Sequence, residues 1–345
     1  MIHRRFTKLY YEHEHIKIFI LLGLIVLILM LIKINNLQEK INIIVPARLG
    51  VSYSPAYTKA LGLDPKKTYQ IILEDLQVKY LRLPAYWNEI EKEEGKFDFT
   101  DLDYYIDEAQ KHQVRVILAI GYKLPRWPEC RSPGWLNLDN EKVRQRKQLE
   151  MLEAVIEHFN DNPTVSTWQV ENEPLLPFGL CPPTDRKFLK EEIEFVRTKT
   201  QKPILLTDSG ELRSWVTPMR LSDYFGTTLY RTVQNKWIGR FDYPFQPWFY
   251  RLKGLVVKSI FAPGNQKILI TELQAEPWTT EFIVNVPAEE QINSFSLQQF
   301  QNNVNFARRV GFEEIYLWGV EWWYWMKFQD HPEYWEYAKS IFNTY

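Results

Sequence analysis

Two apolar runs that lead into glutamate carry most of the information about the fold: Val165–Pro174 reads VSTWQVENEP, and Lys267–Leu273 reads KILITEL. Short apolar runs rich in β-branched and aromatic residues predict buried β-strands. Further runs of this kind recur along the chain, separated by stretches with helical periodicity. The predicted strands are Arg48–Ser54, Tyr80–Pro84, Val114–Ile120, Val165–Val170, Pro203–Thr207, Tyr224–Leu229, Lys267–Thr271 and Glu314–Trp318.

Strands that alternate with helices predict a parallel sheet joined by crossover helices. Eight such units over residues 48–345 fit a (β/α)8 TIM barrel of ordinary size. The alternative is an open doubly wound sheet, which would need a glycine-rich turn after its first strand. Pro55-Ala56-Tyr57 stands there instead. Residues 234–264 form the least regular stretch, which we interpret as an insertion after the sixth strand with its own short helix.

A separate apolar segment precedes this domain. Ile18–Ile32 reads IFILLGLIVLILMLI, and residues 16–34 are long enough to cross a bilayer. A buried core helix and a cleavable signal peptide are the alternatives, but no small-residue cleavage site follows. We expect a single transmembrane anchor at 16–34, a cytoplasmic tail at 1–15 and a linker at 35–47.

The flanking charges predict how this anchor is oriented. Basic residues before the segment outnumber those after it four to two: Arg4, Arg5, Lys8 and Lys17 precede it, and Lys33 and Lys40 follow it. The positive-inside rule then puts the N-terminus in the cytoplasm and residues 48–345 outside. The expected location is the cell membrane, with the lipid bilayer as a partner through the N-terminal helix.

The composition of the 345 residues narrows the function classes. The chain has 42 basic and 43 acidic residues, which leaves no strong positive field for nucleic acid. The six histidines (His3, His13, His15, His112, His158 and His331) avoid the predicted strand ends. A Ser-His-Asp triad and a His-based metal site are therefore not indicated. We expect a monomer without a metal or an organic cofactor.

Chemistry in a (β/α)8 barrel takes place where strands end, and Glu173 and Glu272 follow strands four and seven. A carboxylate after so apolar a run is costly unless it is paired or functional. Glycoside hydrolysis needs two carboxyl groups, one to protonate the leaving oxygen and one to attack the anomeric carbon. Two structural ion-pair acids are the alternative interpretation.

Asn172-Glu173-Pro174 after strand four, with Glu272 on strand seven, resembles clan A of the glycoside hydrolases, which are retaining (β/α)8-barrel enzymes. The resemblance runs from about Leu49 to Trp325. It implies that Glu173 is the acid/base, that Glu272 is the nucleophile and that Asn172 binds the sugar 2-hydroxyl. Arg82, in Leu-Arg-Leu-Pro at the end of strand two, matches the clan arginine that keeps the nucleophile ionised.

The resemblance is mixed between families of the clan. Trp87-Asn88-Glu89-Ile90-Glu91 is similar to β-galactosidase-type and xylanase-type members, and Ile270–Leu273 looks like the xylanase nucleophile strand. The chain as a whole also resembles cellulase-type members. A histidine that many members carry on strand three or six is missing. Tyr230, after strand six, matches the clan tyrosine that steadies the nucleophile.

Aromatic side chains are unusually common: the chain has 13 tryptophans. Eleven of them fall on predicted strand ends or on the loops that follow, where indole faces suit sugar rings; packing in the loops is the alternative. Trp318, ending strand eight, matches the clan platform under the reacting sugar, and Trp322 competes for that role. Cys130 and Cys181 follow the adjacent strands three and four, so we expect a disulfide between them.

The sequence therefore predicts a membrane-anchored retaining glycoside hydrolase that acts on an oligo- or polysaccharide through Glu173 and Glu272. Two alternatives stay open. A transglycosylase would use the same residues with a different acceptor. A membrane-tethered carbohydrate-binding protein without catalytic activity would share the fold, although such proteins usually lose one of the two acids.

Overall fold

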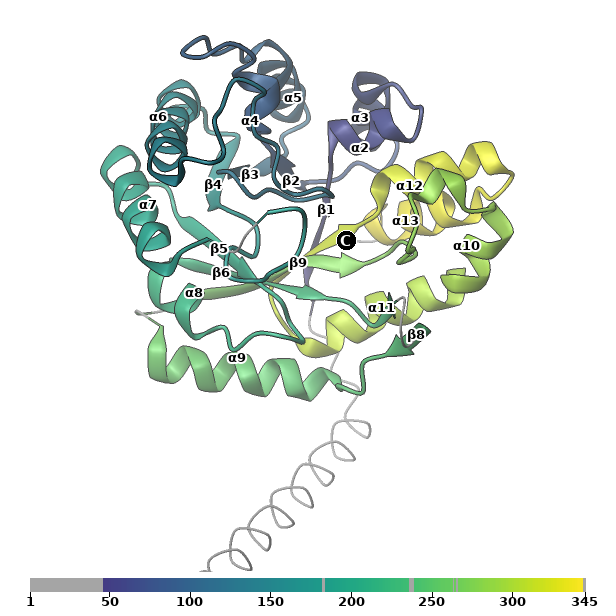
Figure 1. The fold of residues 1–345 in the computed structure, drawn as a ribbon. Coiled ribbons are helices and arrows are strands. Elements are labelled where there is room, and N and C mark those ends of the chain that lie inside the picture. Colours follow the sequence, from purple (N-terminus) through teal and green to yellow (C-terminus); the bar gives the residue numbers. More distant parts are fainter. Residues whose placement is uncertain (1–45, 182–183, 236–238, 263, 265, 344–345) are drawn as a thin grey trace, which may run out of the picture.

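The computed structural model describes residues 46–343 except 182–183, 236–238, 263 and 265, and its centre is a closed parallel barrel (Figure 1). The strand order around the barrel is β1-β10-β9-β6-β5-β4-β3-β2, and every neighbouring pair is parallel. The barrel strands are β1 (Arg48–Ser52), β2 (Tyr80–Pro84), β3 (Arg115–Ile120), β4 (Val165–Val170), β5 (Ile204–Asp208), β6 (Tyr224–Leu229), β9 (Lys267–Gln274) and β10 (Glu314–Trp318). The predicted (β/α)8 barrel is confirmed.

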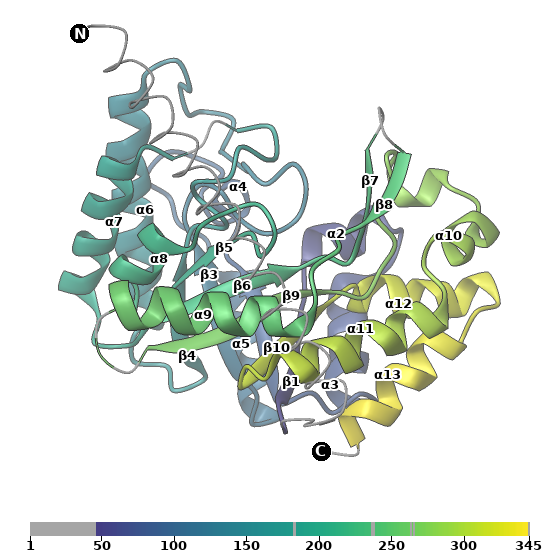
Figure 2. The same ribbon diagram turned by 90° about the horizontal axis from the view of Figure 1, so that it is seen from below.

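Helices surround the barrel, as the two views at right angles show (Figure 1 and Figure 2). The α-helices are α2 (Pro55–Ala60), α3 (Pro65–Glu74), α4 (Trp87–Ile90), α5 (Thr100–Lys111), α6 (Glu141–Phe159), α7 (Arg186–Lys199), α8 (Val216–Leu221), α9 (Pro247–Phe261), α10 (Ala288–Ser294), α11 (Leu297–Val310), α12 (Val320–Met326) and α13 (Glu333–Asn343). Two 3₁₀ turns, Ile283–Asn285 and Lys327–Gln329, complete them among the described residues.

The apolar runs fold as barrel strands because both of their faces are covered. Exposed and buried residues do not alternate along β3, where Val116 to Ile120 are all buried, and β4 is buried along nearly its whole length. Continuous burial is typical of parallel strands that pack on a barrel interior and on outer helices. The carboxyl ends of these strands consequently meet at one mouth of the barrel.

The insertion predicted at 234–264 differs from what the structure contains. An antiparallel hairpin, β7 (Thr232–Asn235) with β8 (Gly239–Asp242), leads into α9, a helix of 15 residues. Helix α9 is one of the helices that surround the barrel, between β6 and β9 in the chain, and not the short helix predicted within an insertion (Figure 1). Its apolar residues lie on two faces, because Leu255 and Ile260 are exposed while Tyr250 and Val257 are buried. That distribution hid the helical periodicity.

The predicted anchor at 16–34, the tail at 1–15 and most of the linker at 35–47 lie outside the described residues. Within the part of the chain that the structure describes, no helix is both long and apolar enough to cross a bilayer.

Candidate active site

Glu173 and Glu272 both lie at the mouth formed by the carboxyl ends of the strands. Glu173 is the third residue after β4, and Glu272 lies near the end of β9. Both residues are almost enclosed: Glu173 is 6% exposed and Glu272 is 4% exposed. Carboxyl groups this deeply buried need compensation by charge, hydrogen bonds or protonation.

The chain after β4 is held in a strained conformation. Glu171 and Glu173 have φ angles of 59° and 42°, in the left-handed region that residues other than glycine seldom adopt. Hydrogen bonds fix this shape, because Asn172 N donates to Lys123 O at 2.7 Å and Glu173 N donates to Thr207 Oγ1 at 2.8 Å. Strain of this kind concentrates at functional sites.

Glu171 locks the two neighbouring loops together. Its carboxylate accepts hydrogen bonds from the backbone N–H groups of Tyr122 and Lys123, each at 2.7 Å. Gly121 makes room for it, since a Cβ there would lie 2.6 Å from Glu171 Oε1. Sequence reasoning missed this residue; its signal is the first acid of Glu-Asn-Glu, two positions before the expected acid/base.

Strand β9 contains a bulge beside Glu272. Pairing with β6 moves from Thr227↔Ile270 to Thr228↔Glu272, and the pairing with β10 shifts at the same place. One extra residue in β9 accounts for both shifts. A bulge redirects the side chains that follow it and is common next to active sites.

Arg82 is the buried cation that accompanies Glu272. The residue is 1% exposed, and its Nη1 donates to Glu272 Oε1 at 2.8 Å. Nη2 donates to Asn172 Oδ1 at 2.6 Å. Because Asn172 Oδ1 accepts this hydrogen bond, the amide nitrogen of Asn172 is the atom that can donate to a ligand. Nε of Arg82 donates to Gln169 Oε1 at 2.6 Å, so the guanidinium joins residues of β2, β4 and β9.

Tyr230 reaches the other oxygen of the same carboxylate. Its hydroxyl donates to Glu272 Oε2 at 3.0 Å. Behind it, Glu211 Oε1 accepts from Tyr230 N at 3.2 Å and from the Tyr250 hydroxyl at 2.8 Å. Burial raises the pKa of Glu211 to about 7. Arg82 and Tyr230 therefore hold Glu272 from two sides, an arrangement that suits an ionised carboxylate.

Glu173 has a different environment. Burial, followed by the negative charge of Glu272, raises the pKa of Glu173 well above its usual value. Its carboxyl group accepts a hydrogen bond from Thr228 Oγ1 at 3.3 Å. A protonated carboxyl beside a compensated carboxylate is the combination that acid-assisted displacement requires.

Two further charged residues lie close to Glu173, and no sequence pattern had pointed to either. Lys123, 1% exposed, donates to the carbonyl oxygens of Glu173 at 3.0 Å and Leu176 at 2.8 Å. It also forms an ion pair with Glu129 at 3.1 Å. Burial raises the pKa of Glu129 to about 7. The one feature of the sequence that could have drawn attention to Glu129 is its position directly before Cys130.

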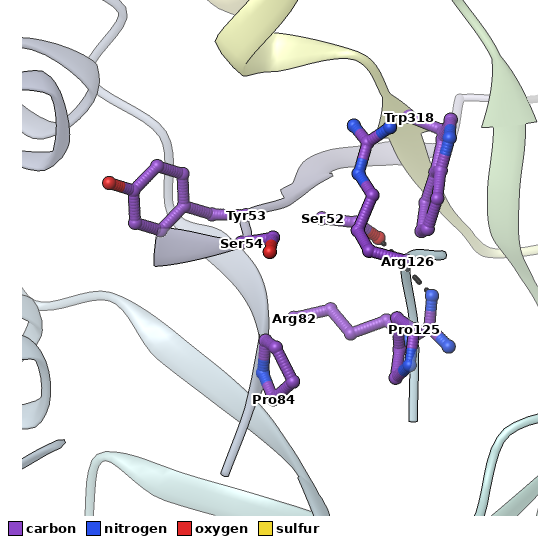
Figure 3. A pocket seen from close by; sticks show the side chains of 8 residues that line it. All are labelled: Ser52, Tyr53, Ser54, Arg82, Pro84, Pro125, Arg126 and Trp318. Atoms are coloured by element: carbon purple, nitrogen blue, oxygen red, sulfur yellow. Dashed lines mark hydrogen bonds between the residues drawn. The ribbon is translucent and has the colours of Figure 1, made fainter. Parts of the chain in front are cut away.

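A small pocket opens next to these groups and is lined by Arg82, Trp318 and Arg126 among others (Figure 3). The guanidinium of Arg126 lies 4.0 Å from the ring centre of Trp318 and 3.8 Å from that of Tyr57. Figure 3 shows Arg126 beside Trp318, with Arg82 extending below them. Trp318 thus lines this pocket with its ring against the Arg126 guanidinium, and its role as a sugar platform stays a prediction.

Trp322, the other candidate for the platform, does not line this pocket. It is fully buried in α12, and its Nε1 donates to Gln291 Oε1 at 2.7 Å. Other tryptophans predicted at the mouth are also completely buried, namely Trp87, Trp215 and Trp323. For these tryptophans the alternative interpretation, packing in the core, is the one that the structure supports.

The predicted disulfide between Cys130 and Cys181 is present, with Cα atoms 5.6 Å apart. It joins the loop after β3 to the loop after β4. Among the described residues, no group of His, Cys, Asp and Glu has the arrangement of a metal site.

Comparisons with known proteins show what this chain is similar to. A family model described as Beta-galactosidase, glycoside hydrolase family 42, matches residues 67–216. The β-galactosidase Bga of Halorubrum lacusprofundi is 25% identical over 179 residues, which are 44% of this chain and 23% of that protein. The chain thus spans less than a quarter of that relative's length.

Solved structures share the fold at low identity. A GH5_18 protein from Bifidobacterium longum has a TM-score of 0.56 and 11% identity, covering 79% of this chain and 69% of that one. An endo-β-1,4-xylanase of family 10 from Gloeophyllum trabeum has a TM-score of 0.54 and 13% identity, covering 80% and 84%. The predicted resemblance is confirmed as a similarity: the chain has the same barrel fold as these glycoside hydrolases and is similar to the family 42 β-galactosidases over residues 67–216.

Proposed function

We propose that this chain is a retaining glycoside hydrolase that acts on β-glycosides by double displacement. The observation that carries the proposal is the contrast between the two carboxyl groups. Glu173 has a pKa raised by burial and by the charge of Glu272, whereas Glu272 accepts hydrogen bonds from Arg82 and Tyr230. A proton donor and a compensated nucleophile are the two roles that the reaction needs.

The reaction proceeds in two steps. Glu173 protonates the glycosidic oxygen while Glu272 attacks the anomeric carbon, which releases the aglycone and leaves a glycosyl ester on Glu272. Glu173, now a carboxylate, takes a proton from water, and the resulting hydroxyl attacks the anomeric carbon. The ester bond to Glu272 breaks as this bond forms, so the sugar leaves with its configuration retained, Glu272 is again a carboxylate and Glu173 is again protonated.

The sugar itself is proposed from the relatives. Bga of Halorubrum lacusprofundi is described as a β-galactosidase, so β-galactosides are the first substrates to test. The full chain in detergent is assayed against fluorogenic β-galactoside, β-glucoside, β-xyloside and β-mannoside. We expect hydrolysis of at least one, and its loss in Glu173→Ala and Glu272→Ala. Full activity in the Glu272 variant would contradict the assignment of the nucleophile.

We further propose that residues 16–34 anchor the enzyme in the cell membrane with the barrel outside the cytoplasm. The apolar run and the basic residues before it support this orientation. A disulfide between Cys130 and Cys181 fits an oxidising compartment. Protease added to intact cells should degrade the barrel, whereas protection of the barrel until the membrane is broken would contradict the orientation.

A further inference from the structure

Four aromatic side chains form a row that starts at the nucleophile. Tyr230, which donates to Glu272, meets Trp278 with ring centres 5.1 Å apart. Trp278 meets Phe178 at 5.8 Å, and Phe178 meets Trp127 at 6.1 Å. We call these four residues the aromatic row. It connects the buried carboxylates to the surface.

The row crosses the mouth of the barrel. Tyr230 follows β6, Trp278 follows β9, Phe178 follows β4 and Trp127 follows β3. Phe178 lies in the same loop as Glu173, five positions further along the chain. The group that leaves during the first step must contact Glu173, because that residue protonates it. We infer that the Phe178 ring, on the same loop as Glu173, faces the leaving group.

The outer rings are held in place by bonds between their loops. The Cys130–Cys181 disulfide ties the loop of Trp127 to the loop of Phe178. Leu180 N donates to Pro128 O at 3.0 Å. Gly179, with a φ of 86°, lets the loops approach, since a Cβ there would lie 2.9 Å from Pro128 O. The platform is thus formed before a ligand arrives, which reduces the entropy lost on binding.

The outer rings are also available to a ligand. Trp127 is 59% exposed and Phe178 is 38% exposed, although such rings are usually buried for their area. The other side of the pocket is filled, because Arg126 lies between Tyr57 and Trp318 and forms an ion pair with Glu321 at 2.9 Å. Trp127 and Phe178 thus keep apolar surface open at the outer end of the row.

We propose that Trp127 and Phe178 form a leaving-group subsite that stacks against a sugar ring, so that the natural substrate is an oligosaccharide with at least one sugar beyond the cleaved bond. The C–H face of a pyranose suits an exposed indole or phenyl face. The same subsite would receive an acceptor sugar in the second step. This inference rests on the proposed hydrolase function and deepens it.

The test compares substrates with and without a ring in the leaving group. The probes are β-1,4-linked galactotriose and β-D-galactopyranosyl fluoride, with the full chain in detergent. Trp127→Ala and Phe178→Ala should each lower kcat/KM for galactotriose roughly tenfold, and leave kcat/KM for the fluoride within about twofold. Leu255→Ala, an equally exposed apolar position on α9 at 58%, is the matched control and should change neither.

A second readout uses acceptor transfer. With galactosyl fluoride as donor and galactobiose as acceptor, the ratio of transfer to hydrolysis should fall in Trp127→Ala. Equal loss on both substrates would indicate that the rings only stabilise the loops and would overturn the subsite. Unchanged kinetics on galactotriose would overturn it as well.

A binding measurement without catalysis separates this inference from the proposed function. If the wild-type chain hydrolyses no glycoside, the hydrolase proposal fails by itself. Galactotriose is then titrated by calorimetry against Glu272→Gln and against Glu272→Gln with Trp127→Ala. Weaker binding after loss of Trp127 supports a sugar subsite in either case, whereas equal affinity or no binding overturns it.

Discussion

Replacement of Arg82 by methionine tests whether Glu272 is held as a charged group. Methionine preserves much of the apolar bulk but donates no hydrogen bond. Glu272, Asn172 and Gln169 would each lose a donor that lies within 2.8 Å. Removing one partner of a buried ion pair costs about 3–5 kcal/mol, because the other charge is left without compensation.

This cost converts into a measurable melting shift. At about 2.1 cal/mol/K per residue, a domain of about 300 residues unfolds with an entropy near 0.6 kcal/mol/K. Arg82→Met should therefore lower Tm by about 5–8 °C in calorimetry of the full chain. The matched control is Arg197→Met, since Arg197 pairs with Asp223 at 3.1 Å but both side chains are partly exposed. An exposed pair contributes at most about 1 kcal/mol, or under about 2 °C.

The double variant Arg82→Met with Glu272→Gln sharpens the test. Neither charge remains, so its free energy of unfolding should exceed the value expected from adding the two single losses by about 2 kcal/mol. Purely additive losses would mean that Arg82 does not compensate a charge on Glu272, and the electrostatic explanation would have to be abandoned. An Arg82→Met variant as stable as the wild type would lead to the same conclusion more simply.

Other outcomes follow from the same geometry. Tyr230→Phe removes the hydroxyl 3.0 Å from the nucleophile and should lower kcat/KM about 10–100-fold, with a loss of at most about 3 kcal/mol in stability. Unchanged kinetics would contradict that role. Because the pKa of Glu173 is raised, the alkaline limb of the kcat/KM profile should lie well above pH 4.5, and a limb at the ordinary glutamate value would count against Glu173 as the acid. The folded-state pKa of Glu211, about 7, exceeds its unfolded value, so its contribution to stability is present below about pH 4.5 and is lost as pH rises through 7. In urea unfolding, the free energy of unfolding of the wild type should therefore fall between pH 5 and pH 8 by about 1–3 kcal/mol more than that of Glu211→Gln. An identical fall in both proteins would contradict this. Reduction of the Cys130–Cys181 disulfide, which closes a separation of 51 residues, should cost up to about 4 kcal/mol in the same assay, and an unchanged midpoint would be the contrary result.

The barrel could be predicted from the sequence because its strands are short, apolar and separated by helical periodicity. The predicted Tyr80–Pro84, Val165–Val170, Tyr224–Leu229 and Glu314–Trp318 agree with the strands residue for residue. The bulge in β9 was not predictable, because the run around Thr271 continues without any break in its apolar pattern. A register shift depends on the neighbouring strands rather than on local sequence.

The charged residues around Glu173 escaped prediction for a related reason. Lys123, Arg126 and Glu129 lie in one irregular loop, and loop geometry leaves no periodic signal. Their roles depend on contacts with carbonyl groups and carboxylates from other loops. Trp322 was misjudged because a tryptophan just after a strand can turn inward as well as outward. The short helix α12 turns it into the core.

Covalent trapping of the glycosyl ester would identify the nucleophile. The full chain is incubated with 2-deoxy-2-fluoro-β-D-galactosyl fluoride, or with the matching fluorosugar of whichever glycoside it hydrolyses, and is digested for peptide mass spectrometry. The double-displacement mechanism predicts one fluorosugar ester, located on Glu272, with loss of activity in proportion to labelling. A label on Glu173 or another residue, or continued turnover without any label, would contradict the assignment of Glu272 as the nucleophile.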